Sequence, residues 1–192
     1  MELELWKSVR IGDMEEVRRL LKTPTIDVNW KNDRPEGKYY KGTAALHHAF
    51  GTRNEDLVIS KMLLAHPDID VNIKTAEGDT PFMRMQSVDY VLIGQEFLMD
   101  ARVNINQLTS EGRSALCWSF RIEHILLQIM IASGRDLEFG KPGDKLSDPF
   151  VTAGQDDEKV ISLLESYQKN PDDAVRRARE ELGISGKRFP FW

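Results

Sequence analysis

Cysteine is almost absent from this chain, which has one Cys among its 192 residues. A single cysteine cannot build an intramolecular disulfide framework, and it fits a protein of a reducing compartment. Long apolar runs are also missing, because no stretch reaches the roughly 18 residues that a membrane-spanning helix needs. Basic charge is in deficit, since 26 Lys and Arg face 31 Asp and Glu for a formal net charge of -5. That balance argues against binding of nucleic-acid backbones. We expect a cytoplasmic protein, with the nucleus as an alternative, and neither nucleic acid nor membrane as a partner.

Motifs of the common enzyme classes are missing as well. The glycine-rich segment 140–145 lacks the spacing of a phosphate-binding loop, and no Gly-x-Ser-x-Gly elbow occurs. One cysteine and four scattered histidines give no zinc spacing. The acidic pair Asp172-Asp173 stands at a predicted helix start, where the helix dipole explains it. We therefore predict a protein that is not an enzyme and that holds no cofactor and no metal.

What the chain does contain is an apolar pattern that recurs at a nearly constant step. Pairs of large apolar residues mark five predicted helices, at Leu20-Leu21, Leu63-Leu64, Phe97-Leu98, Met130-Ile131 and Leu163-Leu164. The first members of these pairs are 43, 34, 33 and 33 residues apart. Two further sets of apolar positions keep a similar step, Leu46, Phe82, Leu116 and Phe150 in one set and Val28, Val71, Ile105 and Leu137 in the other. Recurrence with this period predicts a repeat protein built of helix-turn-helix units.

The best-preserved copy of the pattern spans residues 44–81. It contains Ala44-Ala45-Leu46-His47-His48-Ala49, Leu63-Leu64, Asp70-Val71-Asn72 and Gly78-Asp79-Thr80-Pro81. This copy resembles an ankyrin repeat, whose signature is Thr-Pro-Leu-His-x-Ala with a period of about 33 residues. The resemblance implies an all-α fold, an ankyrin-repeat solenoid of stacked helix-turn-helix units with projecting hairpin loops.

The resemblance covers about residues 3–165 and predicts one domain, residues 1–192. We place the repeats at about 1–31, 42–74, 78–107, 112–138 and 147–169, followed by a capping helix at about 171–183 and a tail at 184–192. The sequence Asn170-Pro171-Asp172-Asp173 is a strong helix start, with a capping Asn and Pro at the first helical position. The tail carries three aromatic residues, which either pack back on the last repeat or form a short docking motif.

Some positions depart from the family pattern. His47 occupies the position where the family's histidine bridges a turn by hydrogen bonds, and we interpret it as structural. Met83 and Cys117 replace that histidine in later copies, and the usual Gly-His turns are missing from the third and fourth repeats. The first hairpin is about ten residues too long, with the surplus at 32–41. This insertion is either a tolerated loop or a binding element.

For function, the resemblance implies a non-catalytic scaffold that binds a protein partner on its concave and hairpin face, as a monomer. The candidate partner-binding residues are aromatic, basic or imidazole side chains: Trp30, Arg34, Tyr39, Tyr40, His48, Arg84, Arg113, Trp118 and Arg121. Tyr, Trp and Arg supply most anchors of protein interfaces. Other interpretations remain open, since His48 could be merely solvated and Trp118 could fill the space of the missing turn.

Two alternative functions follow from the same resemblance. The chain could be a recognition module of a larger enzyme or adaptor that carries the chemistry. It could also be a substrate of an asparagine hydroxylase, because Asn29, Asn72 and Asn106 occupy hairpin positions that such enzymes modify in similar proteins. The identity of the partner does not follow from the sequence.

Overall fold

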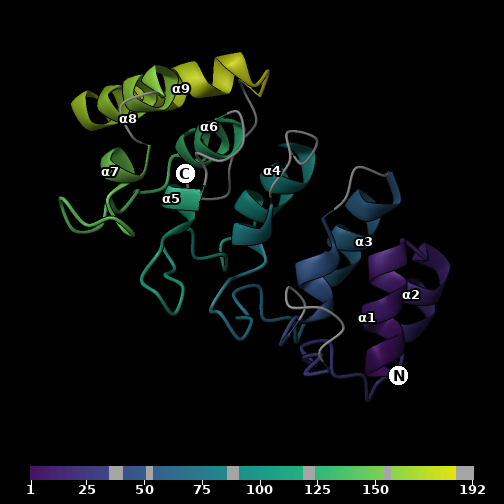
Figure 1. Cartoon of the computed structure of the whole chain (residues 1–192). Helices are drawn as coiled ribbons and strands as arrows, with labels where there is room; N and C mark the ends of the chain where they lie inside the picture. The colour runs from purple at the N-terminus through teal and green to yellow at the C-terminus, as the bar shows by residue number, and fades with distance from the viewer. Residues whose placement is uncertain (35–40, 51–53, 86–90, 119–123, 154–156, 185–192) are drawn as a thin grey trace. The chain divides into compact units, whose positions relative to one another are not determined.

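A computed structural model describes residues 1–34, 41–50, 54–85, 91–118, 124–153 and 157–184 (Figure 1). Over these ranges the chain is mostly helical and forms no β-strand, only isolated bridges at Asn32–Thr43 and Leu108–Ser114. The fold class is therefore all-α. None of the helices in the described ranges is long and apolar enough to cross a membrane. Backbone contacts divide the chain into two compact units, Met1–Met85 and Gln86–Trp192. The predicted single domain and its repeat boundaries stay predictions.

The first unit begins with two helices that a short turn separates. Helix α1 (Glu2–Ile11) ends at Gly12, whose φ of 79° is left-handed. Helix α2 (Met14–Leu20) begins directly afterwards, where the side chain of Asp13 accepts the Glu16 N–H at 3.0 Å. A left-handed glycine and an aspartate cap therefore explain why the chain reverses between these two helices.

The rest of the first unit consists of helix α3 (Asn54–Leu64) and two short 3-10 helices, η1 (Ala45–His48) and η2 (Phe82–Arg84). Helix α1 packs against α2 and η1, and α2 packs against α3 (Figure 1). The core between them includes Trp6, Leu20 and Leu63, which are almost completely buried. The indole N–H of Trp6 lies 3.1 Å from both the carbonyl and the hydroxyl oxygen of Thr43. This large side chain is thus buried with its polar atom satisfied.

The long first hairpin is closed at its base inside this unit. The Asn32 N–H donates to the Thr43 carbonyl at 2.9 Å, and the Gly42 N–H donates to the Asn32 carbonyl at 2.7 Å. Gly42 has a φ of +69°, and a Cβ atom there would lie 2.9 Å from the Ala76 nitrogen. The base of the insertion is therefore a tightly packed turn, while residues 35–40 lie outside the described part of the chain.

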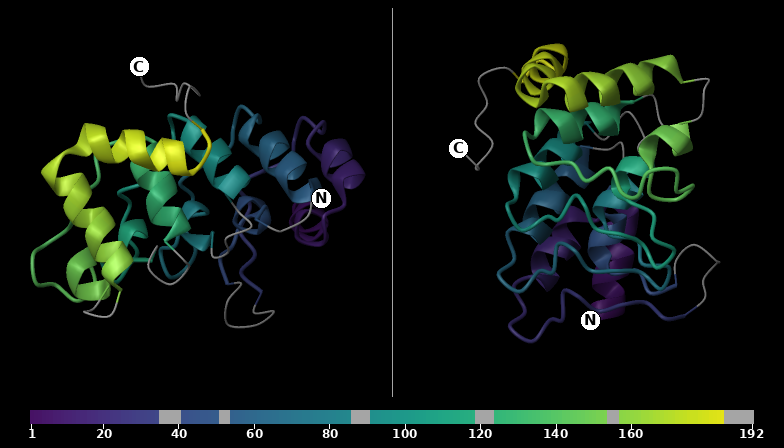
Figure 2. Two further views of the ribbon diagram at one scale, coloured as in Figure 1. Left: turned by 90° about the horizontal axis from the view of Figure 1, so that it is seen from above. Right: turned by 90° about the vertical axis from the view of Figure 1, so that its left-hand side faces the viewer.

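The second unit contains six helices in its described residues: α4 (Val91–Met99), α5 (Ala115–Trp118), α6 (Ile125–Ala132), α7 (Pro149–Ala153), α8 (Glu158–Lys169) and α9 (Pro171–Glu181). Helix α6 is the centre of this unit, because every residue from Leu126 to Ala132 is buried. It contacts α4, α8 and α9 (Figure 2). A helix that is apolar on all sides belongs in a core, which agrees with this position.

Helix α9 starts as the sequence predicts. The side chain of Asn170 accepts the Asp173 N–H at 3.1 Å, Pro171 is the first helical residue, and Gly183 has a φ of 64° just beyond the helix end. Its small residues Ala174 and Ala178 are buried, while its Asp, Glu and Arg side chains are mainly exposed. Helix α9 therefore covers α6 and α8 with an apolar stripe and presents a polar outer face.

Arginine side chains close the ends of two helices in the second unit. The guanidinium of Arg135 donates to the carbonyl oxygens of Leu98, Asp100 and Val103, at and just beyond the C-terminus of α4. The guanidinium of Arg179 donates to the Ala132 carbonyl, the last residue of α6, at 2.8 Å. Helix C-termini leave carbonyl groups without helical partners, and a cation also interacts well with the dipole there.

Candidate protein-binding site

The same tight turn recurs in hairpins of both units. The side-chain oxygens of Asp27, Asp70 and Asn104 each accept the backbone N–H two residues further on, at 2.9, 2.9 and 3.0 Å. In this turn type, a short Asp or Asn side chain hydrogen-bonds its own backbone and thereby replaces a backbone turn. The Asp-Val-Asn and Asn-Ile-Asn sequences therefore determine the local shape of these hairpins.

The asparagine that follows two of these turns, Asn29 in one and Asn106 in the other, connects neighbouring hairpins. In the first unit, Asn29 donates its amide to the Asp68 carbonyl at 2.7 Å and accepts the Asp70 N–H at 2.8 Å. In the second unit, Asn106 donates to the Asp136 carbonyl at 2.9 Å and accepts the Glu138 N–H at 3.1 Å. Both ends of each amide are used, so consecutive hairpins within a unit are held at a defined separation.

His47 bridges two turns, as its position in the sequence predicts. Its Nδ1 accepts the Ala44 N–H at 3.0 Å, so Nε2 carries the hydrogen and donates to the Asp79 carbonyl at 3.1 Å. Burial lowers its pKa to about 4. A neutral, buried imidazole with both nitrogens occupied by backbone groups has a structural role here.

His48 points toward Trp6 and Thr43. Its Nε2 lies 2.9 Å from the Thr43 hydroxyl oxygen, and its ring meets the Trp6 ring edge-on with centroids 4.7 Å apart. Burial lowers its pKa to about 3, with smaller effects from the neighbouring His47 and Arg84. This half-buried imidazole is already engaged with its own unit, so only its outer edge is accessible to a partner.

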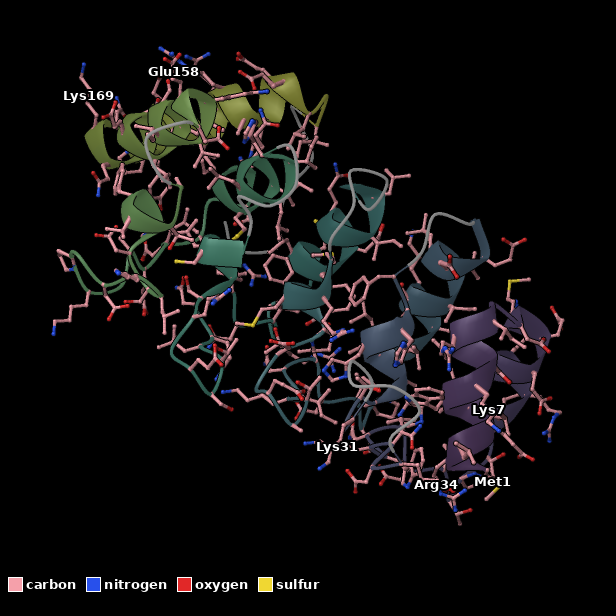
Figure 3. All side chains as sticks on the ribbon, viewed as in Figure 1. Met1, Lys7, Lys31, Arg34, Glu158 and Lys169 are labelled. Carbon is pink, nitrogen blue, oxygen red and sulfur yellow. The ribbon has the colours of Figure 1, made fainter. Side chains whose placement is uncertain are left out.

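The other predicted residues of the first unit lie nearer to solvent. Trp30 is half-buried, and Arg34 is exposed at the beginning of the long hairpin. Arg34 is labelled in Figure 3. Arg84 is half-buried, with 3.7 Å between its guanidinium and the Asp79 carboxylate. The positive charge of Arg84 also contributes, after burial and His47, to lowering the pKa of His48.

In the second unit, the structure describes one predicted side chain. Arg113 is half-buried, and its guanidinium lies 4.0 Å from the Glu111 carboxylate. Trp118 ends helix α5, but its side chain lies outside the described part. Tyr39, Tyr40 and Arg121 lie outside it entirely. Partner binding by the nine residues stays a prediction.

A groove that the sequence did not indicate lies between two hairpins of the second unit. Its volume is about 320 Å³, and its wall includes Leu108, Glu111, Glu138, Lys141, Asp144 and Ser147. These residues come from the hairpin around 104–114 and from the hairpin at 137–148. Lys141 and Ser147 are held together, because the Lys141 N–H donates to the Ser147 hydroxyl at 3.2 Å. Residues about 30 positions apart form this groove, and no local motif marks such a site.

The described hairpins and the groove wall contain charged, polar and apolar side chains side by side. In the described ranges, no three His, Cys, Asp or Glu side chains lie close enough together to hold a metal ion. Charged, amide and apolar side chains alternate on the hairpins and on the groove wall, as they do on protein interfaces. Comparison with protein-family models and with curated protein sequences found no match to this chain.

Proposed function

We propose that this protein is a non-catalytic protein-interaction scaffold built of ankyrin repeats, which binds a protein partner through its hairpins and adjoining short helices. The observation that carries the proposal is the repeated asparagine bridge. Asn29 and Asn106 stand 77 residues apart and connect their neighbouring hairpins through the same pair of hydrogen bonds. Such recurrence is typical of repeat proteins, whose main use is to present an extended binding surface.

The way in which the hairpins are held also supports a binding role. Hydrogen bonds hold their backbones in place, both in the turns at Asp27, Asp70 and Asn104 and in the asparagine bridges. The hairpin tips therefore lose little conformational entropy when a partner binds. Pre-organisation of this kind raises affinity because less ordering is left to occur in the complex. The hairpins and short helices of the first unit also carry exposed or half-buried Trp and Arg side chains, namely Trp30, Arg34 and Arg84. These residue types contribute strongly to protein interfaces.

The test of this function is binding to a captured partner by the purified protein. A partner is first captured from native extract, purified and titrated against the wild-type chain. We expect Trp118→Ala and Tyr39→Ala each to weaken this binding at least about tenfold, or 1.4 kcal/mol, with the melting temperature unchanged. Arg176→Ala is the matched control, because Arg176 lies on the polar outer face of α9 and pairs with Asp173 and Glu180.

Two outcomes contradict the proposal. A chain that captures no saturable protein partner is not an interaction scaffold. If Trp118→Ala instead lowers the melting temperature and leaves affinity intact, Trp118 belongs to the core and the predicted surface is misplaced.

Mass spectrometry of natively expressed protein tests the alternative of asparagine hydroxylation, which requires an added oxygen at Asn29, Asn72 or Asn106.

A further inference from the structure

We propose that the groove between the hairpins at 104–114 and 137–148 receives a lysine or arginine side chain of the partner protein. This inference rests on the proposed scaffold function and adds the chemistry of the bound segment. We call this site the acidic groove and define it by Leu108, Glu111, Glu138, Lys141, Asp144 and Ser147.

The size and wall of the acidic groove suit one long side chain. Its volume of about 320 Å³ exceeds that of a single residue, and Leu108, 43% exposed, contributes apolar surface to the wall. Lysine and arginine have an apolar stem and a charged head, so their stems pack on apolar surface while their heads stay with polar groups. A shorter or wholly apolar side chain would contact only part of the wall or would place no positive charge beside its carboxylates.

The charges around the groove favour a cation. The wall contains three carboxylates, those of Glu111, Glu138 and Asp144, and the ammonium group of Lys141. With the guanidinium of Arg113, 4.0 Å from Glu111, one negative charge remains in excess. The Asp144 carboxylate accepts the Leu146 N–H at 2.7 Å and the Ser147 N–H at 3.0 Å. These backbone bonds lower the pKa of Asp144, so it remains negative at neutral pH.

Arg113 forms only a weak ion pair with a carboxylate of the acidic groove. Its guanidinium lies 4.0 Å from Glu111, and the Glu111 side chain is 74% exposed. Exposed ion pairs contribute little, a median of roughly 0–1 kcal/mol, so an incoming cation can exchange for Arg113. The carboxylates are spread along two hairpins and do not converge as metal ligands within the described part of the chain. An extended protein segment matches this spacing better than a metal ion does.

The groove is also rigid enough to select a ligand. Asn106 ties one hairpin to the other through the Asp136 carbonyl and the Glu138 N–H. At Gly140, a Cβ atom would overlap the backbone of Ser147, so the second hairpin is packed tightly on itself. A preformed site of this kind loses less entropy when it binds.

The experiment is a ¹⁵N NMR titration of the full chain with two short peptides. The probe is acetyl-Gly-Arg-Leu-Arg-Gly-amide, and the charge-reversed control is acetyl-Gly-Glu-Leu-Glu-Gly-amide. We expect the arginine peptide to shift amide signals of residues 106–114 and 138–147 in a saturable way. The double variant Glu111→Gln/Glu138→Gln should weaken this binding about tenfold. Leu108→Ala should weaken it as well, because the apolar contact with the peptide stem is removed.

Glu158→Gln is the matched control for charge, since Glu158 is exposed in the first turn of α8 of the same unit (Figure 3). It should bind the arginine peptide as the wild type does. The inference is overturned if the glutamate peptide binds equally well, if the shifts fall outside both hairpins, or if Glu158→Gln and the double variant have the same effect. The inference is also overturned if spermidine binds with the affinity of the arginine peptide and Leu108→Ala weakens neither ligand, because only general charge attraction would then remain.

The groove assignment and the scaffold function can be wrong independently, and the two experiments distinguish these cases. If a captured protein partner binds but the arginine peptide does not, the scaffold function stands and the groove assignment is wrong. If the arginine peptide binds in the groove but no protein partner is captured, the scaffold function is wrong.

Discussion

Gly140 and Gly143 stand three residues apart in one hairpin, and both have a positive φ, of +66° and +80°. They differ in their surroundings. A Cβ atom at Gly140 would overlap the backbone of Ser147, whereas a Cβ atom at Gly143 would meet nothing within 4 Å. Alanine at Gly143 would therefore be destabilised only by the left-handed backbone, whereas alanine at Gly140 would be destabilised by steric overlap as well. The sequence alone does not distinguish these two glycines.

We expect Gly140→Ala to destabilise the protein by about 3 kcal/mol or more and Gly143→Ala by about 1 kcal/mol. The left-handed conformation costs a residue with a Cβ roughly 1–2 kcal/mol, and overlap with backbone adds to it. Urea unfolding of the two variants measures the difference. Equal losses would show that the backbone around Ser147 can move away at no cost.

Stability should fall in mild acid because of His47 and His48. Folding lowers their pKa values to about 4 and about 3, below the 6.5 of an exposed histidine. Between these values the unfolded chain binds more protons than the folded chain. Histidine-linked stability is therefore complete above about pH 6.5 and is lost as the pH falls toward 4. One pKa unit corresponds to 1.36 kcal/mol, so His47 alone should contribute roughly 3 kcal/mol to this loss.

Urea unfolding at a series of pH values between 7 and 4 measures this loss. His47→Asn, which keeps a polar side chain in the same place, should flatten the pH dependence in this window. His66→Gln is the control, since His66 lies outside the cluster with Trp6 and Thr43. An unchanged slope in His47→Asn would mean that His47 does not cause the acid sensitivity.

At the scale of elements, helix ends are capped either by neighbouring residues or by side chains that are distant in the sequence. Local caps are readable, because Asp13, Asp157 and Asn170 each accept the N–H three residues further on, within the same short segment. The C-terminus of α4 is different. Its carbonyl groups are satisfied by Arg135, which lies more than 30 residues further along the chain. No sequence pattern indicates this contact, since an isolated Arg-Asp pair has no distinguishing neighbours.

We expect Arg135→Met to destabilise the protein by about 2–4 kcal/mol. The substitution keeps the side-chain stem but removes donors to three carbonyl groups. Hydrogen bonds from charged groups each contribute roughly 1.5–3 kcal/mol, and the total is smaller here because Arg135 is only half-buried, so that water can replace part of the lost bonds. Arg102→Met is the matched control, because Arg102 pairs with the Asp100 side chain but is 45% exposed. It should cost less than about 1 kcal/mol. Chemical denaturation compares the two, and equal effects would contradict the capping role of Arg135.

At the scale of the whole molecule, the chain is two compact units, and the second has a helical cover. Helix α9 packs on α6 and α8, and two polar contacts accompany this packing. Arg179 donates to the Ala132 carbonyl, and Gln128 donates to Glu181 at 2.6 Å. Helix α9 thus combines a buried apolar stripe with a polar outer face, as the capping elements of repeat proteins do.

Deletion of residues 171–192 should therefore lower the melting temperature and promote self-association. Apolar burial contributes roughly 25 cal/mol per Å², so the loss of this helix should cost a few kcal/mol. Ala178→Asp tests the same contact without a truncation, because Ala178 is 3% exposed in the apolar stripe of α9. Arg177→Asp, on the exposed face, is its control. A truncated chain that stays monomeric with unchanged melting would show that α9 is not a cap.

The sequence by itself determined the features that depend on neighbouring residues. It indicated an all-α chain and the start of α9 at Asn170-Pro171, and the resemblance to a repeat signature implied that His47 bridges a turn. Each of these follows from apolar periodicity, from a local cap or from a short motif, and a few adjacent residues are enough to define them.

Only the tertiary structure decided which distant side chains meet. It placed His48 on Trp6 and Thr43, it brought Arg135 to the end of α4, and it set Leu108 and Asp144 on the wall of one groove. The physical reason is that these contacts join residues tens of positions apart. The direction of each side chain depends there on how elements pack, and a single sequence contains no periodic signal for that packing.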